Sequence, residues 1–367
     1  MLAASTGNPQ NRGSNVSVKA GLRSALALWI LVFAGCSSAP KTANQLGGST
    51  VAAASNPLPS WNDGPAKQAI FDFVKTTTDR NNPGFVPPED RIATFDQDGT
   101  TWVSHPIYTQ VLFTFDRVAA LAGEHPEWKT KQPFRAILTG DKEAMAKFTL
   151  EDIEILVMAT HTGMTTEAFQ SIVKNWMATA EHPRFHQPYA RMVYQPMLEV
   201  MRYLRDNGYR TYIVTGGGQA FVRSYAQDVY GVPPEQVIGS ALTTRYESKD
   251  GHSLLMREPK LLLNNDLAGK PEDIYLFLGR HPKAAFGNST GDRQMLEYTQ
   301  SGRGASLEML VFHDDAVREY AYGPAQGLPD SKVGTFPQNL YDEAKAKGWT
   351  VISMKNDWKQ IFGSTSK

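Results

Sequence analysis

The sequence is poor in cysteine: among its 367 residues only Cys36 is one. A single cysteine excludes any disulfide within the chain, so the fold depends on its packed core. An excess of basic charge is also absent, because 37 Lys and Arg residues balance 37 Asp and Glu residues. A nucleic-acid partner is therefore not expected. No feature of the sequence indicates a protein partner.

Long apolar runs are missing as well. The apolar run of residues 26–34 is too short to span a bilayer comfortably. It follows a stretch that carries basic residues and no acid, and it precedes the small residues around Cys36. This order is typical of an export signal, so we expect residues 1–35 to be a signal peptide that is cleaved.

The residues before the expected cleavage point carry a second signal. The run Phe33–Cys36 resembles the lipobox of bacterial lipoproteins, which implies diacylation of Cys36 and attachment to a membrane by lipid. Within that pattern, Ser37 favours the outer membrane, with the protein facing the periplasm. A soluble periplasmic protein is the alternative. Residues 36–60 are rich in Ser, Ala, Gly and Pro, which predicts a flexible tether.

The folded part is predicted to begin near Trp61. After an apolar stretch at residues 92–95, and again beyond residue 196, helical and strand patterns alternate. The expected strands are 209–214, a short one near Val237, 284–286, 307–312 and 351–354, with a hairpin around 249–251; the expected helices are 197–206, 219–230, 271–278, 294–298 and 341–347. Such alternation predicts an α/β fold with a doubly wound parallel sheet covered on both faces.

Residues 103–195 interrupt this alternation. They carry helical patterns and no convincing strand, with helices expected at 107–122, 151–161 and 165–180. A helical segment between two parts of an α/β domain is best interpreted as an inserted cap. The predicted organisation is a core domain of residues 61–102 and 196–367 with a helical cap of residues 103–195.

Polar residues follow three of the expected strands. Asp96 and Asp98 come directly after residues 92–95, Thr215 and three glycines follow one strand, and the turn Gly287–Asp292 follows another. Ligands of a doubly wound sheet bind outside the carboxyl ends of its strands, so we expect these residues to meet. Two acids spaced two residues apart, next to a glycine that allows a turn, would suit a metal ion and a phosphate.

The order of the motifs is more specific than any one of them. DxDGT stands at Asp96–Thr100, followed by Thr215–Gly217, then Gly269–Pro271, then Gly287–Asp292. This order resembles the four motifs of the haloacid dehalogenase-like superfamily, most closely its phosphoserine-phosphatase-like hydrolases. The resemblance covers roughly residues 61–354. It implies a Rossmann-like core and Mg²⁺-dependent hydrolysis of a small phosphorylated metabolite.

The resemblance also implies roles for individual residues. Asp96 would be the nucleophile that forms an aspartyl-phosphate, and Asp98 the acid that protonates the leaving oxygen and then activates water. The second acid favours a phosphatase over a dehalogenase. Thr215 and the amide of Gly216 would bind the phosphate, and Lys270 would neutralise it and keep Asp96 ionised.

The metal site departs from the common family pattern. Mg²⁺ prefers oxygen ligands, which Asp96, the backbone carbonyl of Asp98, and Asn288 or Asp292 can provide. Asn288 stands where an acid is more common, so the site has one negative charge less. We expect Asp292 to matter more than Asn288. No cluster of cysteine or histidine indicates zinc.

Several other residues are candidates with less specific signals. Lys260 is a rival of Lys270. Five side chains could contact the substrate, although a surface or packing role is more common for each: His105, Tyr108, Arg135, Arg184 and Arg191. The run His313–Asp315 follows a strand that we predict to lie at the sheet edge, and we interpret it as structural.

Two alternative functions stay open at this point. A phosphotransferase or mutase would use Asp96 in the same way, but a second hydroxyl group would take the phosphoryl group instead of water. A catalytically weak envelope lipoprotein that binds a phosphorylated ligand is the other alternative, and Asn288 is the residue that keeps it open.

Overall fold

The computed structural model describes residues 56–363, so the predicted signal peptide, Cys36 and most of the tether lie outside the described residues. Packing begins at Leu58, which is fully buried. At Ser60 the backbone N–H and the hydroxyl donate to the carboxylate of Glu199 at 2.9 and 2.7 Å. The chain is therefore held in place slightly before Trp61. Within residues 56–363, no helix has the length and apolar character needed to cross a bilayer.

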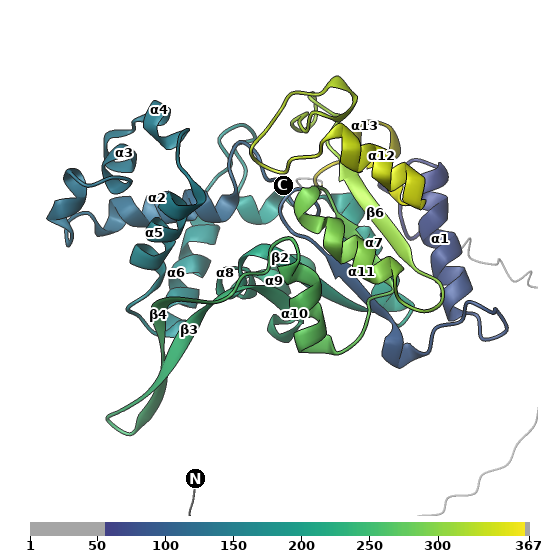
Figure 1. The fold of residues 1–367 in the computed structure, drawn as a ribbon, viewed down its shortest axis with the longest axis horizontal. Helices are drawn as coiled ribbons and strands as arrows, with labels where there is room; N and C mark the ends of the chain where they lie inside the picture. The colour runs from purple at the N-terminus through teal and green to yellow at the C-terminus, as the bar shows by residue number, and fades with distance from the viewer. Residues whose placement is uncertain (1–55, 364–367) are drawn as a thin grey trace, which may run out of the picture. The chain divides into compact units, whose positions relative to one another are not determined.

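A seven-stranded sheet in the order β4-β3-β2-β1-β5-β6-β7 forms the centre of the described part (Figure 1). All neighbouring strands are parallel except β3 and β4. The strands are β1 (Ile92–Phe95), β2 (Arg210–Gly218), β3 (Val237–Lys249), β4 (His252–Leu263), β5 (Ala284–Gly287), β6 (Leu307–Phe312) and β7 (Thr350–Ser353). The strand that precedes the two acids thus lies in the middle, between β2 and β5.

Helices cover both faces of this sheet. Successive side chains of a strand point to opposite faces, and here both faces carry apolar residues that pack against helices. One face packs against α1 (Pro65–Thr78), α7 (Gln195–Asp206), α8 (Gln219–Arg223) and α9 (Ala226–Tyr230). The other packs against α10 (Gly269–Leu278), α11 (Arg293–Gln300) and α12 (Gln338–Lys347). On β1, Ile92 belongs to the second core while Ala93 and Phe95 belong to the first. The predicted doubly wound α/β fold is confirmed.

The segment between β1 and α7 is mainly helical. It contains α2 (Thr109–Leu121), α3 (Phe134–Thr139), α4 (Lys142–Met145), α5 (Leu150–His161) and α6 (Thr166–Thr179). A capping box formed by Thr149 and Asp152 begins α5, and the side chain of Thr165 accepts the N–H of Ala168 at the start of α6. Trp128 and Leu156 belong to a small separate core of this segment.

The hairpin of β3 and β4 differs from the expectation of a short strand near Val237, since β3 has 13 residues. The turn lies at Asp250 and Gly251, as expected, and both have positive φ angles. The outer edge of β4 contacts the helical segment, because the N–H of Gly163 donates to the carbonyl of Arg257 at 3.0 Å and the N–H of Arg257 donates to that of Met164 at 2.9 Å. The hairpin therefore connects the sheet to the predicted cap.

Two further expectations about elements are wrong. The helix expected at 219–230 is divided into α8 and α9, because Tyr225 has φ −137° and ψ −8°, which ends regular helix between them. The strand before His313 is not an edge strand, because β6 lies between β5 and β7 and the edge is β7. The short helix α13 (Met354–Asp357) follows β7 directly.

Candidate active site

The polar motifs meet at the carboxyl ends of three adjacent strands. Asp96 follows β1, Thr215 lies towards the end of β2, and Asn288 follows β5. The backbone N–H of Asp96 donates to the carbonyl of Phe286 at 2.9 Å, so the first and fourth motifs start side by side. This is the place where a doubly wound sheet binds its ligands.

Lys270 links these motifs from the start of α10. Its ammonium group donates to Asp96 Oδ1 at 2.6 Å, to Asp292 Oδ1 at 2.7 Å and to the carbonyl oxygen of Val214 at 2.8 Å. All three protons of the ammonium are therefore engaged. The side chain is only 2 % exposed. Lys260, its rival, is exposed on β4, so the structure brings Lys270 and not Lys260 to the two acids.

Asp292 supports the turn of the fourth motif. Its Oδ2 accepts the backbone N–H groups of Asn288 and Ser289 at 2.9 and 3.0 Å, while its Oδ1 accepts Lys270. A Cβ on Gly287 would lie 2.6 Å from the Cγ of Asp292, so only glycine allows this close approach. Donors occupy both carboxylate oxygens of Asp292. A carboxylate oxygen that accepts one hydrogen bond keeps a lone pair, so the expectation that Asp292 matters more than Asn288 at the metal stays a prediction.

The oxygen atoms near Asp96 fit a hard cation. Lys270 donates to Oδ1 of Asp96, whereas the hydroxyl of Thr100 lies 3.5 Å from Oδ2 and 3.1 Å from Asn288 Oδ1. Among residues 56–363, the carbonyl oxygen of Asp98 accepts no hydrogen bond, and the Nδ2 of Asn288 is buried with no partner. The described residues contain no group of three His, Cys, Asp or Glu side chains that could hold a metal. A cation here would need carboxylate, amide and backbone oxygens, which suits Mg²⁺.

The pKa values of both acids, Asp96 and Asp98, are raised. Burial and the charge of Asp292 raise the pKa of Asp96 above its usual range, against the opposing charge of Lys270. Burial raises the pKa of Asp98 to about 6, although Trp102 Nε1 donates to its Oδ1 at 2.8 Å. Burial opposes the charge of Lys270, but Asp292 and Asp96 raise its pKa overall. Additional positive charge beside Asp96 would therefore favour its ionised, nucleophilic form.

The glycine loop of the second motif is held by its neighbours. The N–H of Gly217 donates to Thr215 Oγ1 at 3.0 Å, which leaves the proton of this hydroxyl for another acceptor. The N–H of Gly218 donates to Gln110 Oε1 at 2.7 Å. The side chain of Asn265 donates to the carbonyl of Thr215 at 2.8 Å. Sequence reasoning missed Gln110 and Asn265, because no spacing rule connects them to this loop.

Of the five side chains considered as substrate contacts, three make defined contacts within the protein and two are exposed. His105 stacks on Tyr322 with ring centroids 3.6 Å apart, and burial lowers the pKa of His105 to about 4. The hydroxyl of Tyr108 accepts the N–H of Gly334 at 2.9 Å, and burial raises its pKa. Arg184 is structural, since it donates to the backbone oxygens of Glu319 and Ala316. The last two candidates are exposed: Arg135 and Arg191.

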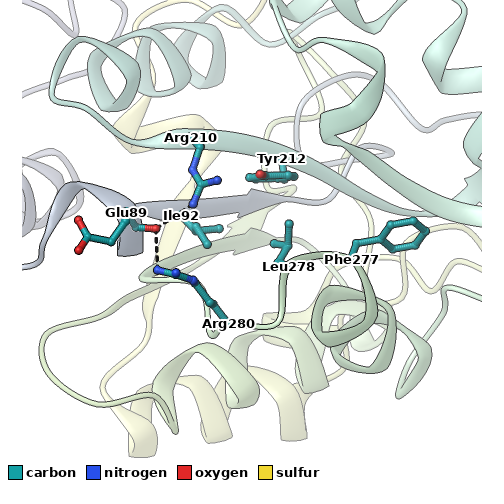
Figure 2. Close-up of a pocket in the computed structure, with 7 residues that line it drawn as sticks. All are labelled: Glu89, Ile92, Arg210, Tyr212, Phe277, Leu278 and Arg280. Carbon is teal, nitrogen blue, oxygen red and sulfur yellow. Dashed lines mark hydrogen bonds between the residues drawn. The ribbon is translucent and has the colours of Figure 1, made fainter. Parts of the chain in front are cut away.

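A separate pocket of about 310 Å³ lies at the other end of the sheet (Figure 2). Ile92 and Arg210, which begin β1 and β2, line it together with Arg280. It therefore lies at the amino ends of the strands, and it does not belong to the site around Asp96.

Fold and site define an α/β enzyme with buried acids and a lysine at the carboxyl ends of a parallel sheet. A family model described as haloacid dehalogenase-like hydrolase matches residues 93–297, which is more than half of the chain. The chain belongs to this family of hydrolases. No curated protein matches its sequence.

Three solved structures show how distant the structural likenesses are. A protein of unknown function from Bordetella pertussis Tohama I has 16 % identity and a TM-score of 0.45, over 71 % of this chain and 97 % of that one. Cytosolic 5′-nucleotidase IIIB bound to cytidine has 14 % identity and a TM-score of 0.37, over 68 % and 80 %. A probable phosphoserine phosphatase from Vibrio cholerae has 13 % identity and a TM-score of 0.35, over 79 % and 69 %. Scores this low carry no argument about function.

Proposed function

We propose that this hydrolase is a Mg²⁺-dependent phosphatase that cleaves small phosphomonoesters through an aspartyl-phosphate on Asp96. The observation that carries this proposal is the bond between Lys270 and Asp96, which holds a buried carboxylate at the carboxyl end of β1 and places a positive charge beside it. Asp98 lies two residues further on, and Thr215 lies towards the carboxyl end of the neighbouring strand β2. These residues supply a nucleophile, an acid and a phosphate-binding hydroxyl in one place.

In the first step a carboxylate oxygen of Asp96 bonds to phosphorus as the bond from phosphorus to the ester oxygen breaks. The carboxyl of Asp98 gives its proton to the departing oxygen, which leaves as an alcohol. A pKa of about 6 keeps part of Asp98 protonated near neutral pH. The bond from Trp102 Nε1 holds Asp98 Oδ1, so Oδ2 is the oxygen free to deliver the proton.

In the second step the Asp98 carboxylate takes a proton from water. The water oxygen bonds to phosphorus while the bond between phosphorus and Asp96 breaks, which releases phosphate and restores both acids. Thr215 donates its hydroxyl to a phosphate oxygen. Lys270 acts through its charge, since Asp96, Asp292 and the carbonyl of Val214 already accept its three protons.

Asp96, the carbonyl oxygen of Asp98, and Asn288 or Asp292 would hold the Mg²⁺ ion. When bound, the ion supplies positive charge that offsets the repulsion between the nucleophile and the phosphate. Asn288 contributes an amide oxygen without a negative charge, so we expect weaker Mg²⁺ binding than an aspartate at this position would give.

Hydrolysis of a panel of phosphomonoesters, with and without Mg²⁺, tests this proposal. Asp96→Asn should lower the rate by at least about 1,000-fold, because it removes the nucleophile. The matched control is Asp228→Asn, an exposed aspartate of α9, which should behave like the wild type. Equal rates in the wild type and Asp96→Asn would refute the mechanism. Phosphate transfer to an added alcohol in place of release would favour the phosphotransferase, and ligand binding without turnover the weak binding protein.

We propose also that the enzyme is exported and anchored by lipid at Cys36, facing the periplasm. The order of a basic stretch, a short apolar run and the only cysteine of the chain supports this. Cells grown with labelled palmitate should label the wild-type protein and not Cys36→Ser. Label that persists in the variant would count against lipidation and favour the soluble periplasmic form.

A further inference from the structure

His313, the first residue after β6, contacts the turn that follows the two catalytic acids. Its side chain is 2 % exposed, and its Nε2 lies 2.7 Å from the carbonyl oxygen of Gly99. A carbonyl oxygen can only accept, so Nε2 carries a hydrogen and donates it. The other ring nitrogen, Nδ1, lies 3.2 Å from Oε2 of Glu319. The imidazole therefore connects the carboxylate of Glu319 to the carbonyl group of Gly99, the residue after Asp98.

Glu319 is itself held on both oxygens. Its side chain is fully buried. The backbone N–H of Tyr320 donates to Oε2 at 2.7 Å, and the hydroxyl of Tyr194 donates to Oε1 at 3.3 Å. These bonds fix the carboxylate, and the carboxylate fixes the orientation of His313. The pattern is that of a carboxylate that orients a histidine towards its target.

The same segment contacts the catalytic turn at a second point. The ring of Tyr322 lies between His313 and His105, with centroid distances of 4.2 and 3.6 Å. Its hydroxyl lies 2.8 Å from the hydroxyl of Ser104, and a Cβ on Gly99 would lie 3.1 Å from it. Gly99 has φ +84°, and its N–H donates to the carbonyl of Trp102 at 2.8 Å. Both backbone groups of Gly99, its N–H and its carbonyl, therefore form hydrogen bonds that hold the turn after Asp98.

Stability of the fold alone does not account for this pair. Burial of a histidine and a glutamate is costly, and apolar residues of similar volume often stabilise a core at least as well. The pair is directed at one carbonyl, and that carbonyl belongs to the residue after the proposed general acid. A small displacement of a catalytic group lowers the rate strongly. His313 and Glu319 therefore matter because they fix the conformation of this turn.

We propose that His313 and Glu319 are positioning residues for Asp98. They hold the peptide of Gly99 and thereby direct the Asp98 carboxyl towards the leaving oxygen. Neither residue touches the substrate. This inference rests on the proposed phosphatase function, and it assigns a role in that reaction to the segment after β6.

Leaving groups of different acidity separate positioning of the acid from a structural role. A p-nitrophenolate leaves without much protonation, whereas the alkoxide of an alkyl phosphate needs a proton from Asp98. In His313→Leu we expect kcat for an alkyl phosphate to fall at least about 10-fold more than kcat for p-nitrophenyl phosphate, with KM little changed. His313→Gln should recover part of the loss, because its amide can donate to the carbonyl of Gly99. Glu319→Gln should show the same selectivity with a smaller loss.

The chain offers a matched control in His281. Its ring stacks on Tyr298 at 3.9 Å and its Nδ1 lies 2.7 Å from the carbonyl oxygen of that residue. It thus makes the same two kinds of contact far from the acids, beside the amino end of β5. His281→Leu should leave the ratio of the two rates unchanged.

The possible results separate the two proposals. Equal losses on both substrates in the variants of His313 and Glu319 would overturn the positioning role while the phosphatase stands. A wild-type protein that hydrolyses neither substrate would instead overturn the phosphatase. If His313→Leu does not fold, the ratios for His313→Gln and Glu319→Gln decide, since both keep about the volume of the native side chain and a polar group that can form hydrogen bonds.

Discussion

The ammonium group of Lys270 lies 2.6 Å from Asp96 although 174 residues separate the two in sequence. The same ammonium lies 2.7 Å from Asp292. All three side chains are buried, with at most 10 % exposure. One cation thus balances two carboxylates in a region where an unpaired charge is costly, and a change in any of the three affects the others.

Replacement of this lysine should damage both folding and catalysis. Lys270→Met leaves Asp96 and Asp292 facing each other without a cation, and we expect the free energy of unfolding to fall by about 3 to 5 kcal/mol. Denaturant unfolding and phosphatase assays measure the two effects. Lys67→Met is the control, because Lys67 is buried to a similar degree but pairs with the exposed Asp63 at 2.8 Å. A variant of Lys270 as stable and active as that control would contradict the role assigned here.

An aspartate in place of Asn288 should strengthen the metal site. Asn288→Asp adds a negative charge near Asp96, so half-maximal activity should require about 10-fold less Mg²⁺. Without Mg²⁺ the added charge should lower the melting temperature, because it repels the carboxylates nearby. Activity against Mg²⁺ concentration and melting with a chelator measure these effects. The control Asn81→Asp lies on the surface, and an unchanged Mg²⁺ requirement in Asn288→Asp would argue against ligation by residue 288.

Gly287→Ala should disturb the site without any change of charge. The new Cβ would lie 2.6 Å from the Cγ of Asp292, so the side chain that binds Lys270 must shift. We expect a loss of about 1 to 3 kcal/mol in the free energy of unfolding and a clear loss of activity. Gly123→Ala is the control, since nothing lies within 4 Å of its added Cβ. Thermal unfolding of both variants decides; equal melting temperatures would contradict the close contact.

Glu308 should make the fold less stable at high pH. The residue is 6 % exposed on β6, and burial raises the pKa of its carboxyl from 4.5 to about 7. Between these values the unfolded chain loses its proton first, so the free energy of unfolding falls as pH rises. Above pH 7 the free energy of unfolding stops falling, after a total loss of up to about 3 kcal/mol. Glu308→Gln should remove this decline, in contrast to the exposed Glu272→Gln. Identical pH profiles of the wild type and Glu308→Gln in denaturant unfolding would refute this.

The sequence predicted the elements that have a regular apolar pattern. The strand expected at 307–312 has those bounds, and β1 and β5 lie where the patterns placed them, because their side chains are buried on both faces. It did not predict the length of β3. Its last seven residues, 243–249, are all polar or charged except Tyr246, and they extend beyond the parallel part of the sheet.

The sequence also predicted which motifs meet, since strand ends in a parallel sheet share one edge. The sequence could not predict the contacts of Gln110, Asn265 and the pair of His313 and Glu319 with the site, because each contact depends on how distant segments pack. The order of strands was equally hidden, and His313 was therefore assigned to the wrong part of the sheet. The roles of Asp96, Asp98 and Thr215 stay predictions until the variants are measured.

The hydrogen bond between Gly218 and Gln110 connects the glycine loop to α2. If α2 moved away from the sheet, the N–H of Gly218 would lose this acceptor and would donate to water or to a ligand instead. A phosphate oxygen is an acceptor that could replace the amide oxygen of Gln110. The loop expected to bind phosphate and the helical segment thus share one hydrogen bond, so the position of α2 decides whether the N–H of Gly218 is available to a ligand.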